Sequence, residues 1–165
     1  MVLILKRFIA ALCCLLCLAA YSPARAAKAA PGLSARSAIM LEKDGGTVLF
    51  EQNADEKPLI ASITKLMTAL VVMERAQPEE QVEILEAYTR TEGSSMYLKA
   101  GERYSVRELL YGLLLHSGND AATALACHVA GSEKDFAALM NEKAEALGME
   151  NSSFENPHGL DGETH

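Results

Sequence analysis

Residues 62–75 read SITKLMTALVVMER, a stretch of strong helix character that ends at Gln77-Pro78. Positions 63–73 are apolar on nearly every face of such a helix, and this pattern predicts a buried helix. Lys65 lies in its first turn, where removing an ammonium group from water is costly unless partners surround it. The lysine therefore needs a chemical explanation.

Ser62 lies three residues before Lys65, so both side chains project from one helix face about one turn apart. A neighbouring base turns a serine hydroxyl into a nucleophile, and lysine serves as that base where burial and the helix N-terminus lower its pKa. The same N-terminal amides favour an oxyanion near Ser62. The alternative is an ordinary N-cap followed by a solvated lysine, because Ser-x-x-Lys is common by chance.

A second polar group, Ser117-Gly118-Asn119, interrupts two apolar helical runs and is expected to face an interior. The Ser117 hydroxyl could relay a proton between Lys65 and a leaving group. The Asn119 amide could bind a substrate carbonyl and the lysine. The alternative is a turn between two helices that uses ordinary capping residues.

The rest of the chain predicts a hairpin followed by a mostly helical block. The predicted strands cover residues 37–42, 47–51 and 82–85, and the predicted helices cover residues 105–115, 120–130 and 132–147. Residues 89–101 are predicted to be a loop, and Asn119 is predicted to cap the helix that follows it. No strand is predicted after residue 85, so the sheet begun by the hairpin needs further strands.

The amino-acid composition and net charge exclude some classes of binding partner. The chain has 165 residues, 50% hydrophobic and 22% charged, which is typical of a globular protein, and its net charge is −7. The first 26 residues hold three basic residues and no acidic one, so the remainder is more acidic still. Such a surface repels nucleic acid phosphates and anionic membranes, and no nucleic acid partner is expected.

The first 26 residues have the three parts of a secretory signal peptide. Lys6 and Arg7 precede the apolar run 8–20, and Ala24-Arg25-Ala26 forms a small-x-small cleavage site. A retained membrane anchor is the alternative, but this run is shorter than the roughly 20 residues that a spanning helix needs. We therefore expect cleavage after Ala26, a leader over residues 27–33, and an exported protein.

Metal and disulfide chemistry are not expected. Three of the four cysteines lie within the predicted signal peptide, which leaves Cys127 as a filler of core space. The four histidines form no zinc-binding pattern, and His158 is interpreted as a loop-stabilising residue. No glycine-rich phosphate loop is present, so no metal and no cofactor are predicted.

Four stretches together resemble the serine-type D-alanyl-D-alanine carboxypeptidases, the low-molecular-mass penicillin-binding proteins. They are ASITKLMTA at 61–69, LKAGE at 98–102, HSGNDAA at 116–122 and NPHGLDG at 156–162. The similarity covers about residues 34–165, which would form the catalytic domain. It implies an α/β fold, the α+β sandwich of the β-lactamase and penicillin-binding-protein transpeptidase-like proteins. Mostly its helical part and its first β-hairpin would be present here.

The resemblance also implies roles for these residues. Ser62 would be the acylated nucleophile, Lys65 its proton acceptor, and Ser117 with Asn119 the proton relay and substrate clamp. The substrate would be a peptidoglycan stem peptide ending in D-Ala-D-Ala, and β-lactam antibiotics would acylate the same serine. The enzyme would act outside the cytoplasm, in the periplasm or on the outer face of the cytoplasmic membrane.

The third motif of the family, Lys-Thr-Gly on a late edge strand, does not occur in the 165 residues. In the family it binds the substrate carboxylate, and its strand supplies an oxyanion-hole amide. We therefore expect an incomplete domain with little or no activity by itself, and we expect any carboxy-terminal membrane anchor to lie beyond these 165 residues. The alternatives are a β-lactamase, which would deacylate quickly, and a non-catalytic envelope protein that binds wall fragments.

Overall fold

The structure, a computed structural model, describes residues 32–160 and residue 162. The predicted signal peptide and residues 27–31 of the predicted leader lie outside the described residues. The chain divides into two compact units, residues 1–55 and residues 56–165. The predicted hairpin belongs to the first unit, and both Ser62 and Ser117 belong to the second.

The first unit contains the predicted hairpin. Strand β1 (Ala38–Leu41) pairs antiparallel with β2 (Val48–Gln52), and each has only the other as a neighbour in its sheet. The side chain of Glu42 accepts hydrogen bonds from the amides of Asp44 and Gly45 and so closes the turn. Apolar side chains on both strands remain about half exposed, namely Ile39, Met40, Leu41, Val48 and Leu49. The hairpin therefore gains little hydrophobic stabilisation within its own unit.

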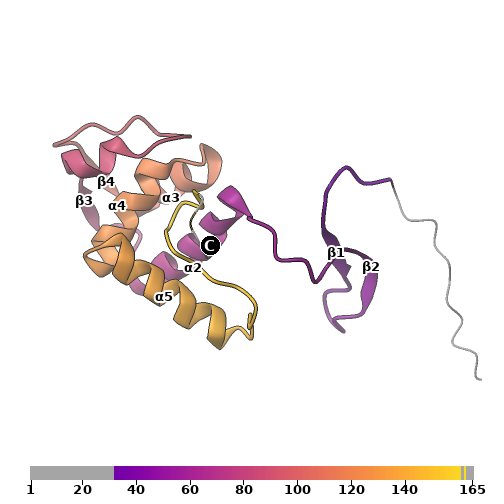
Figure 1. Cartoon of the computed structure of the whole chain (residues 1–165). Helices are drawn as coiled ribbons and strands as arrows, with labels where there is room; N and C mark the ends of the chain where they lie inside the picture. Colours follow the sequence, from indigo (N-terminus) through magenta and orange to yellow (C-terminus); the bar gives the residue numbers. More distant parts are fainter. Residues whose placement is uncertain (1–31, 161, 163–165) are drawn as a thin grey trace, which may run out of the picture. The chain divides into compact units, whose positions relative to one another are not determined.

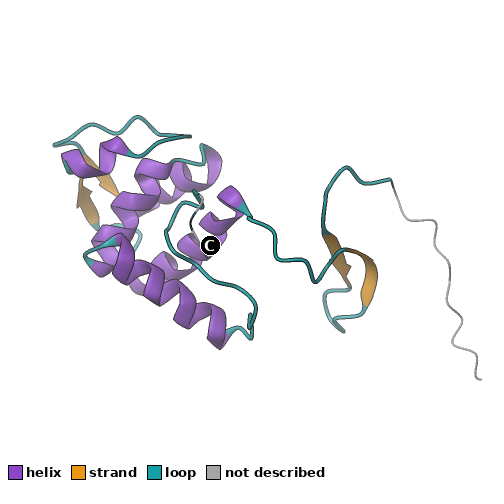
Figure 2. Ribbon diagram, in the orientation of Figure 1, coloured by secondary structure: helices purple, strands orange, loops and turns teal. Residues whose placement is uncertain are grey.

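The second unit is mostly helical (Figures 1 and 2). In chain order its elements are η1 (Ala61–Ile63), α2 (Thr64–Arg75), β3 (Gln81–Glu83), η2 (Glu86–Arg90), β4 (Arg103–Ser105), α3 (Val106–Leu115), α4 (Asn119–Ala130) and α5 (Glu133–Ala146). Helix α4 lies at the centre of this unit and packs against α2, α3 and α5.

The core forms around the first two turns of α4. Four alanines there are fully buried (Ala121, Ala122, Ala124 and Ala126), and such small side chains let the other helices approach closely. Larger buried side chains fill the space around them: Val71, Val72, Leu109, Leu113, Leu125, Phe136 and Met140. This packing fixes the N-termini of α2 and α4 relative to each other, and the polar motifs lie at those two ends.

The prediction that no strand follows residue 85 is wrong. Strand β4 pairs antiparallel with β3, and Val82 lies opposite Tyr104. Each strand has only three residues, which is too short for an alternating pattern to be recognised in the sequence. The predicted loop 89–101 overlaps the end of η2 at residues 89 and 90 and is otherwise confirmed.

The predicted helix ends are largely confirmed. Ser105 and Glu108 form a capping box at the start of α3, Ser132 caps α5, and Gly131 ends α4 in the left-handed conformation. The predicted cap at Asn119 is wrong, because Gly118 is the N-cap of α4 and Asn119 is already helical. The Asn119 side chain instead contacts a distant loop.

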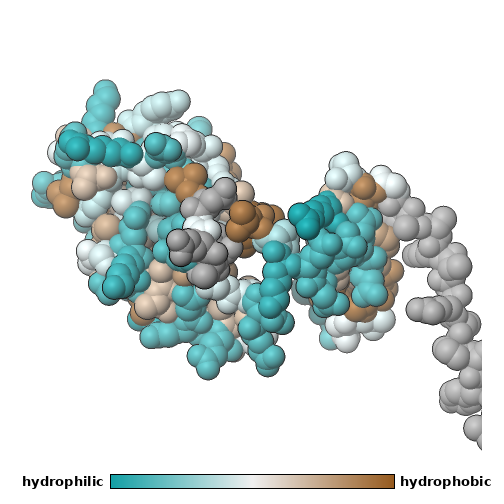
Figure 3. Space-filling view, viewed as in Figure 1, coloured by the Kyte–Doolittle hydropathy of each residue, from teal (hydrophilic) through white to brown (hydrophobic). Residues whose placement is uncertain are grey.

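Helix α2 is buried on one side rather than on every side. Lys65, Val71 and Val72 are buried, whereas Leu66 is 64% exposed and Met73 is 63% exposed. Apolar side chains are visible among hydrophilic ones on the surface of this unit (Figure 3). The prediction of a fully buried helix is thus wrong, since the neighbouring helices pack against only one face. No helix in the described part of the chain is both long and apolar enough to span a membrane.

Candidate active site

Ser62 and Lys65 meet at the start of α2. Ser62 lies in η1, directly after Ala61, whose φ of 47° places it in the left-handed region. The Lys65 Nζ atom donates a hydrogen bond of 3.1 Å to Ser62 Oγ, as the helical spacing predicts. Ser62 is exposed and Lys65 is 2% exposed, so the hydroxyl is open to a substrate while its basic partner is shielded from water.

Ser117 reaches Ser62 from the break between α3 and α4. Its Oγ donates a hydrogen bond of 2.8 Å to Ser62 Oγ across a separation of 55 residues. Ser117 has a φ of 55°, a conformation that non-glycine residues rarely adopt and that often occurs at functional sites. The structure therefore joins Ser117, Ser62 and Lys65 in one continuous chain of polar atoms.

The environment of Lys65 favours its neutral form. Its Nζ also donates a buried hydrogen bond of 2.8 Å to the backbone oxygen of His158. Both acceptors, the Ser62 hydroxyl and this carbonyl, are uncharged, so no full negative charge among them balances the ammonium group. Burial lowers the pKa of Lys65 below its ordinary value of 10.5. A lowered pKa leaves a larger fraction of the lysine unprotonated and so available to act as a base.

The His158 carbonyl is held in place by residues 156–160, named here turn 156–160. The Asn156 side chain accepts hydrogen bonds from the amides of His158 and Gly159, and the His158 ring nitrogen Nδ1 accepts one from the Leu160 amide. The last of these bonds confirms the interpretation of His158 as a loop-stabilising residue. In Figure 1 the segment after α5 runs back over α2, which brings this turn to Lys65.

Two further contacts attach turn 156–160 to the first turns of α2. The Thr68 hydroxyl donates a buried hydrogen bond of 2.6 Å to the Pro157 oxygen. Gly159 has a φ of 83°, and a Cβ there would lie 2.0 Å from the backbone oxygen of Ala61. Only glycine allows so close an approach beside Ser62.

Asn119 lies beside Ser117, but its carboxamide binds a distant loop and makes no hydrogen bond with Lys65, so the predicted contact with the lysine is wrong. Its Nδ2 donates a hydrogen bond of 2.6 Å to the Glu92 oxygen, and its backbone amide donates one of 2.7 Å to the Ser94 oxygen. Its Oδ1 is buried and has no hydrogen-bond partner within the described part of the chain. An unpaired buried acceptor is uncommon in proteins, and this one is a candidate for a ligand contact that a local rearrangement would open.

Three features of the site were not predicted from the sequence. They are the His158 carbonyl, the loop over residues 92–98 (loop 92–98), and the buried carboxylate of Asp120. A charged residue that opens the run DAATALA was a usable signal, because it places a carboxylate within an apolar helix face. The backbone contacts had no such signal, since any residue can supply a carbonyl.

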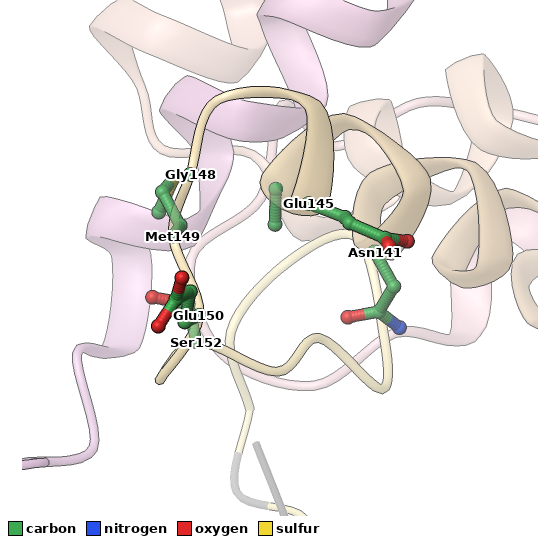
Figure 4. A pocket seen from close by; sticks show the side chains of 7 residues that line it. Asn141, Glu145, Gly148, Met149, Glu150 and Ser152 are labelled. Carbon is green, nitrogen blue, oxygen red and sulfur yellow. The ribbon is translucent and has the colours of Figure 1, made fainter.

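Other features lie outside this site. Cys127 is a half-buried free thiol whose pKa is raised by burial, in keeping with its interpretation as a space-filling residue. The described residues contain no cluster of side chains suited to a metal ion. A hollow of about 420 Å³ at the end of α5 is lined by Asn141, Glu145 and the segment after that helix, and by none of the residues above (Figure 4).

The arrangement is suited to acyl transfer. Hydroxyl hydrogens rotate, so the contacts that join Lys65, Ser62 and Ser117 can carry a proton in either direction. Neutral Lys65 can take the Ser62 proton as Oγ attacks a carbonyl carbon, and the Ser117 hydroxyl lies 2.8 Å from the attacking atom, where it can donate a proton. No cofactor is needed for these steps.

Comparison with known proteins places the chain among cell-wall peptidases. The family model for D-alanyl-D-alanine carboxypeptidases matches residues 24–165. D-alanyl-D-alanine carboxypeptidase DacF from Bacillus subtilis is 41% identical over 136 residues, and DacC from Escherichia coli is 42% identical over 144. The crystal structure of DacD from Francisella tularensis matches 81% of this chain with a TM-score of 0.76 and 39% identity.

These matches cover only part of each relative. The aligned region is 79% of this chain but 35% of DacF, and 80% of this chain but 36% of DacC. It is 34% of the DacD chain in the crystal structure. The fold of these neighbours confirms the predicted architecture, of which this chain has a mostly helical part and a hairpin.

Proposed function

Since this chain belongs to the D-alanyl-D-alanine carboxypeptidase family, we propose that it carries the acylation machinery of a serine D-Ala-D-Ala carboxypeptidase. The observation that carries the proposal is the polar chain from Lys65 Nζ through Ser62 Oγ to Ser117 Oγ, with links of 3.1 and 2.8 Å. The substrate is a peptidoglycan stem peptide that ends in D-Ala-D-Ala, and β-lactams acylate the same serine.

Acylation begins when neutral Lys65 accepts the Ser62 proton and Oγ bonds to the carbonyl carbon of the penultimate D-alanine. The carbonyl oxygen becomes an oxyanion, which the amides at the start of α2 help to stabilise. The Ser117 hydroxyl, which lies 2.8 Å from Ser62 Oγ, then donates its proton to the amide nitrogen, and the proton held by Lys65 restores the hydroxyl once the two side chains come into contact. The C–N bond breaks, the terminal D-alanine leaves, and an ester on Ser62 remains.

Deacylation uses the same groups. Lys65 removes a proton from a water molecule that attacks the ester carbon, and Ser62 recovers its proton as the peptide leaves. Asn119 contributes its open Oδ1, which accepts a hydrogen bond from a substrate N–H group. This role gives the buried acceptor a partner only when substrate is bound.

The substrate places the reaction outside the cytoplasm, where stem peptides are exposed. The relatives named above support a role in the cell wall. The first 26 residues resemble a signal peptide, with the basic pair Lys6 and Arg7 and a small-x-small site that ends at Ala26. This pattern supports export of the protein and removal of the signal peptide. Residues 34–165 then belong to the catalytic domain and follow a short leader.

Covalent labelling tests the proposal. We would incubate two proteins with a fluorescent penicillin: the full chain, and a chimera in which residues 24–165 are joined to the remaining part of B. subtilis DacF. Mass spectrometry then identifies the labelled residue. We expect labelling of Ser62 in the chimera, and labelling at least about a hundredfold slower in the chain alone, which lacks the Lys-Thr-Gly stretch.

Matched variants make the test specific. S62A should abolish labelling of the chimera, whereas S132A, which removes a serine hydroxyl at the cap of α5, should leave it intact. The chimera should also release D-alanine from a peptide ending in D-Ala-D-Ala. A folded chimera that is not labelled, or one whose label survives S62A, contradicts the proposal.

A further inference from the structure

Asp120, the second residue of α4, is a buried charged residue that the mechanism above does not use. Its side chain is held by four hydrogen bonds, donated by Ser95 Oγ (2.7 Å), the Met96 amide (2.9 Å), the Leu98 amide (3.1 Å) and the Ala121 amide (2.9 Å). Three of the four donors belong to loop 92–98. This carboxylate therefore attaches the loop to the start of α4.

These donors keep the carboxylate ionised. Burial raises the pKa of Asp120, but the hydrogen bonds from Ser95 and the three amides outweigh it, so the pKa is lowered. A buried anion that accepts hydrogen bonds from several backbone amides is a strong and directional anchor. Asp120 is 1% exposed, so water does not compete for these bonds.

The anchored loop in turn holds Asn119. Loop 92–98 supplies both acceptors for this residue, the Glu92 oxygen for its carboxamide and the Ser94 oxygen for its backbone amide. The loop backbone also passes close to the carboxamide, because a Cβ at Gly93 would lie 2.9 Å from Asn119 Nδ2. The Nδ2 bond fixes the rotation of the carboxamide and so decides where Oδ1 points.

The turn before α4 fits against the same loop. A Cβ at Gly118 would lie 3.0 Å from Asp120 Oδ1 and 3.3 Å from the Met96 amide nitrogen. The glycine between Ser117 and Asn119 thus leaves room for the carboxylate and the loop. A displaced loop would move this turn as well.

From these contacts we propose that Asp120 is a positioning residue, which aims the Asn119 carboxamide by holding loop 92–98 against the start of α4. The step from Asn119 to the reaction rests on the proposed function. The step from Asp120 to Asn119 rests on the hydrogen bonds alone.

Asp120→Asn is the informative substitution, because it keeps the shape and removes one acceptor oxygen. Oδ1 accepts from two amides, and Oδ2 accepts from a hydroxyl and an amide. Either orientation of the new carboxamide places an NH₂ group against at least one backbone N–H, which cannot turn away. Ser95→Ala removes a single donor and serves as a milder variant.

Hydrogen exchange of the full chain tests the first step. In D120N we expect exchange of the Met96, Leu98 and Asn119 amides to be accelerated at least about tenfold more than that of the buried Leu125 amide, which reports the change in global stability. S95A should accelerate the same three amides to a smaller extent. D135N, which alters an exposed carboxylate at the start of α5, should change none of them. Unchanged exchange at Asn119 in both D120N and S95A overturns the proposal.

A double-mutant cycle on penicillin acylation of the chimera tests the second step. If Asp120 acts through Asn119, D120N and N119A should each slow acylation by about tenfold or more, and the double variant should be no slower than N119A. Losses that multiply indicate a general structural role and overturn the proposal. If the chimera is not acylated at all, the proposed function fails, while the exchange experiment still decides whether Asp120 holds Asn119.

Discussion

Turn 156–160 and loop 92–98 bind the two buried ionisable residues of the site, Lys65 and Asp120, with opposite hydrogen-bonding groups. The turn presents carbonyl oxygens to donors on α2, namely Lys65 and Thr68. The loop presents N–H and O–H donors to an acceptor on α4, Asp120. A buried cation thus meets only uncharged acceptors, whereas a buried anion is surrounded by donors.

The pKa values of both groups are lowered, but the consequences are opposite. For Lys65, burial favours the neutral amine, which is the form that can take a proton from Ser62. For Asp120, the donated hydrogen bonds overcome burial and favour the charged form, which fixes a loop. Under the proposed function, Lys65 is the reactive group and has only uncharged hydrogen-bond acceptors as partners. Asp120 is the structural group and accepts four hydrogen bonds.

The largest expected effect distinguishes these two roles directly. In the chimera, K65M should slow acylation by about 10² to 10⁴-fold, because the general base is lost. Its free energy of unfolding should change by less than about 1 kcal/mol, since burying an apolar side chain in place of a polar amine offsets the lost hydrogen bonds. D120N should instead lose about 1 to 3 kcal/mol of stability, because a buried N–H loses its acceptor.

Penicillin labelling rates and urea denaturation of the same two variants provide the measurement. R75M, which removes an exposed cation further along α2, is the control and should affect neither quantity. If K65M is destabilised as much as D120N, Lys65 has a structural role like that of Asp120.

A smaller effect is expected where turn 156–160 touches the chain beside Ser62. G159A should lower the free energy of unfolding by about 3 kcal/mol, since the new methyl group would collide with the Ala61 carbonyl and φ is positive. G131A is a matched control, with a φ of 81° and open space around it. It should cost about 1 kcal/mol, from backbone strain alone.

Urea denaturation of G159A and G131A measures both values. Equal losses in the two variants would show that the close approach of the turn to Ala61 contributes nothing to stability.

A still smaller effect is expected for the second anchor of the turn. T68V removes the hydroxyl that bonds the Pro157 oxygen and should lower the free energy of unfolding by about 1 to 2 kcal/mol. T89V removes a hydroxyl with a local partner in η2 and should cost less than about 0.5 kcal/mol. Thermal unfolding of the two variants checks the difference, and a T68V protein as stable as T89V would contradict it.

The most gradual effect is the dependence on pH. Lys65 releases its proton at a lower pH when folded than when unfolded, so stability should rise with pH from its folded pKa towards 10.5. The acylation rate should rise as the pH increases through the folded pKa of Lys65, because the amine becomes neutral there. Asp120 has the opposite window, because its contribution is present above pH 3.8 and is lost as the pH falls through its lowered pKa.

Urea midpoints measured across pH for K65M and D120N isolate the two windows. K65M should lose the alkaline rise alone, and D120N should lose the acid fall alone. A variant that alters the other window would show that the two sides of the site titrate together.

Most of the helix ends could be predicted from the sequence, because capping depends on residues that are close together in the chain. The capping box at Ser105 and Glu108, the cap at Ser132 and the left-handed Gly131 involve residues a few positions apart, so the sequence contains all the partners. Strand β4 was missed because three residues carry almost no pattern, and its pairing with β3 decides its conformation. The Asn119 cap was mispredicted because a loop some 27 residues earlier binds its side chain.

For the site, the sequence by itself determined that Ser62 and Lys65 touch, because helical geometry brings side chains three residues apart onto one face. Only the tertiary structure decided that Ser117 meets Ser62 across 55 residues and that Lys65 meets the His158 carbonyl across 93. These contacts depend on how α2, α4 and the segment after α5 pack. Backbone groups are the same in every residue, so no side-chain pattern in the sequence marks which of them a buried charge will reach.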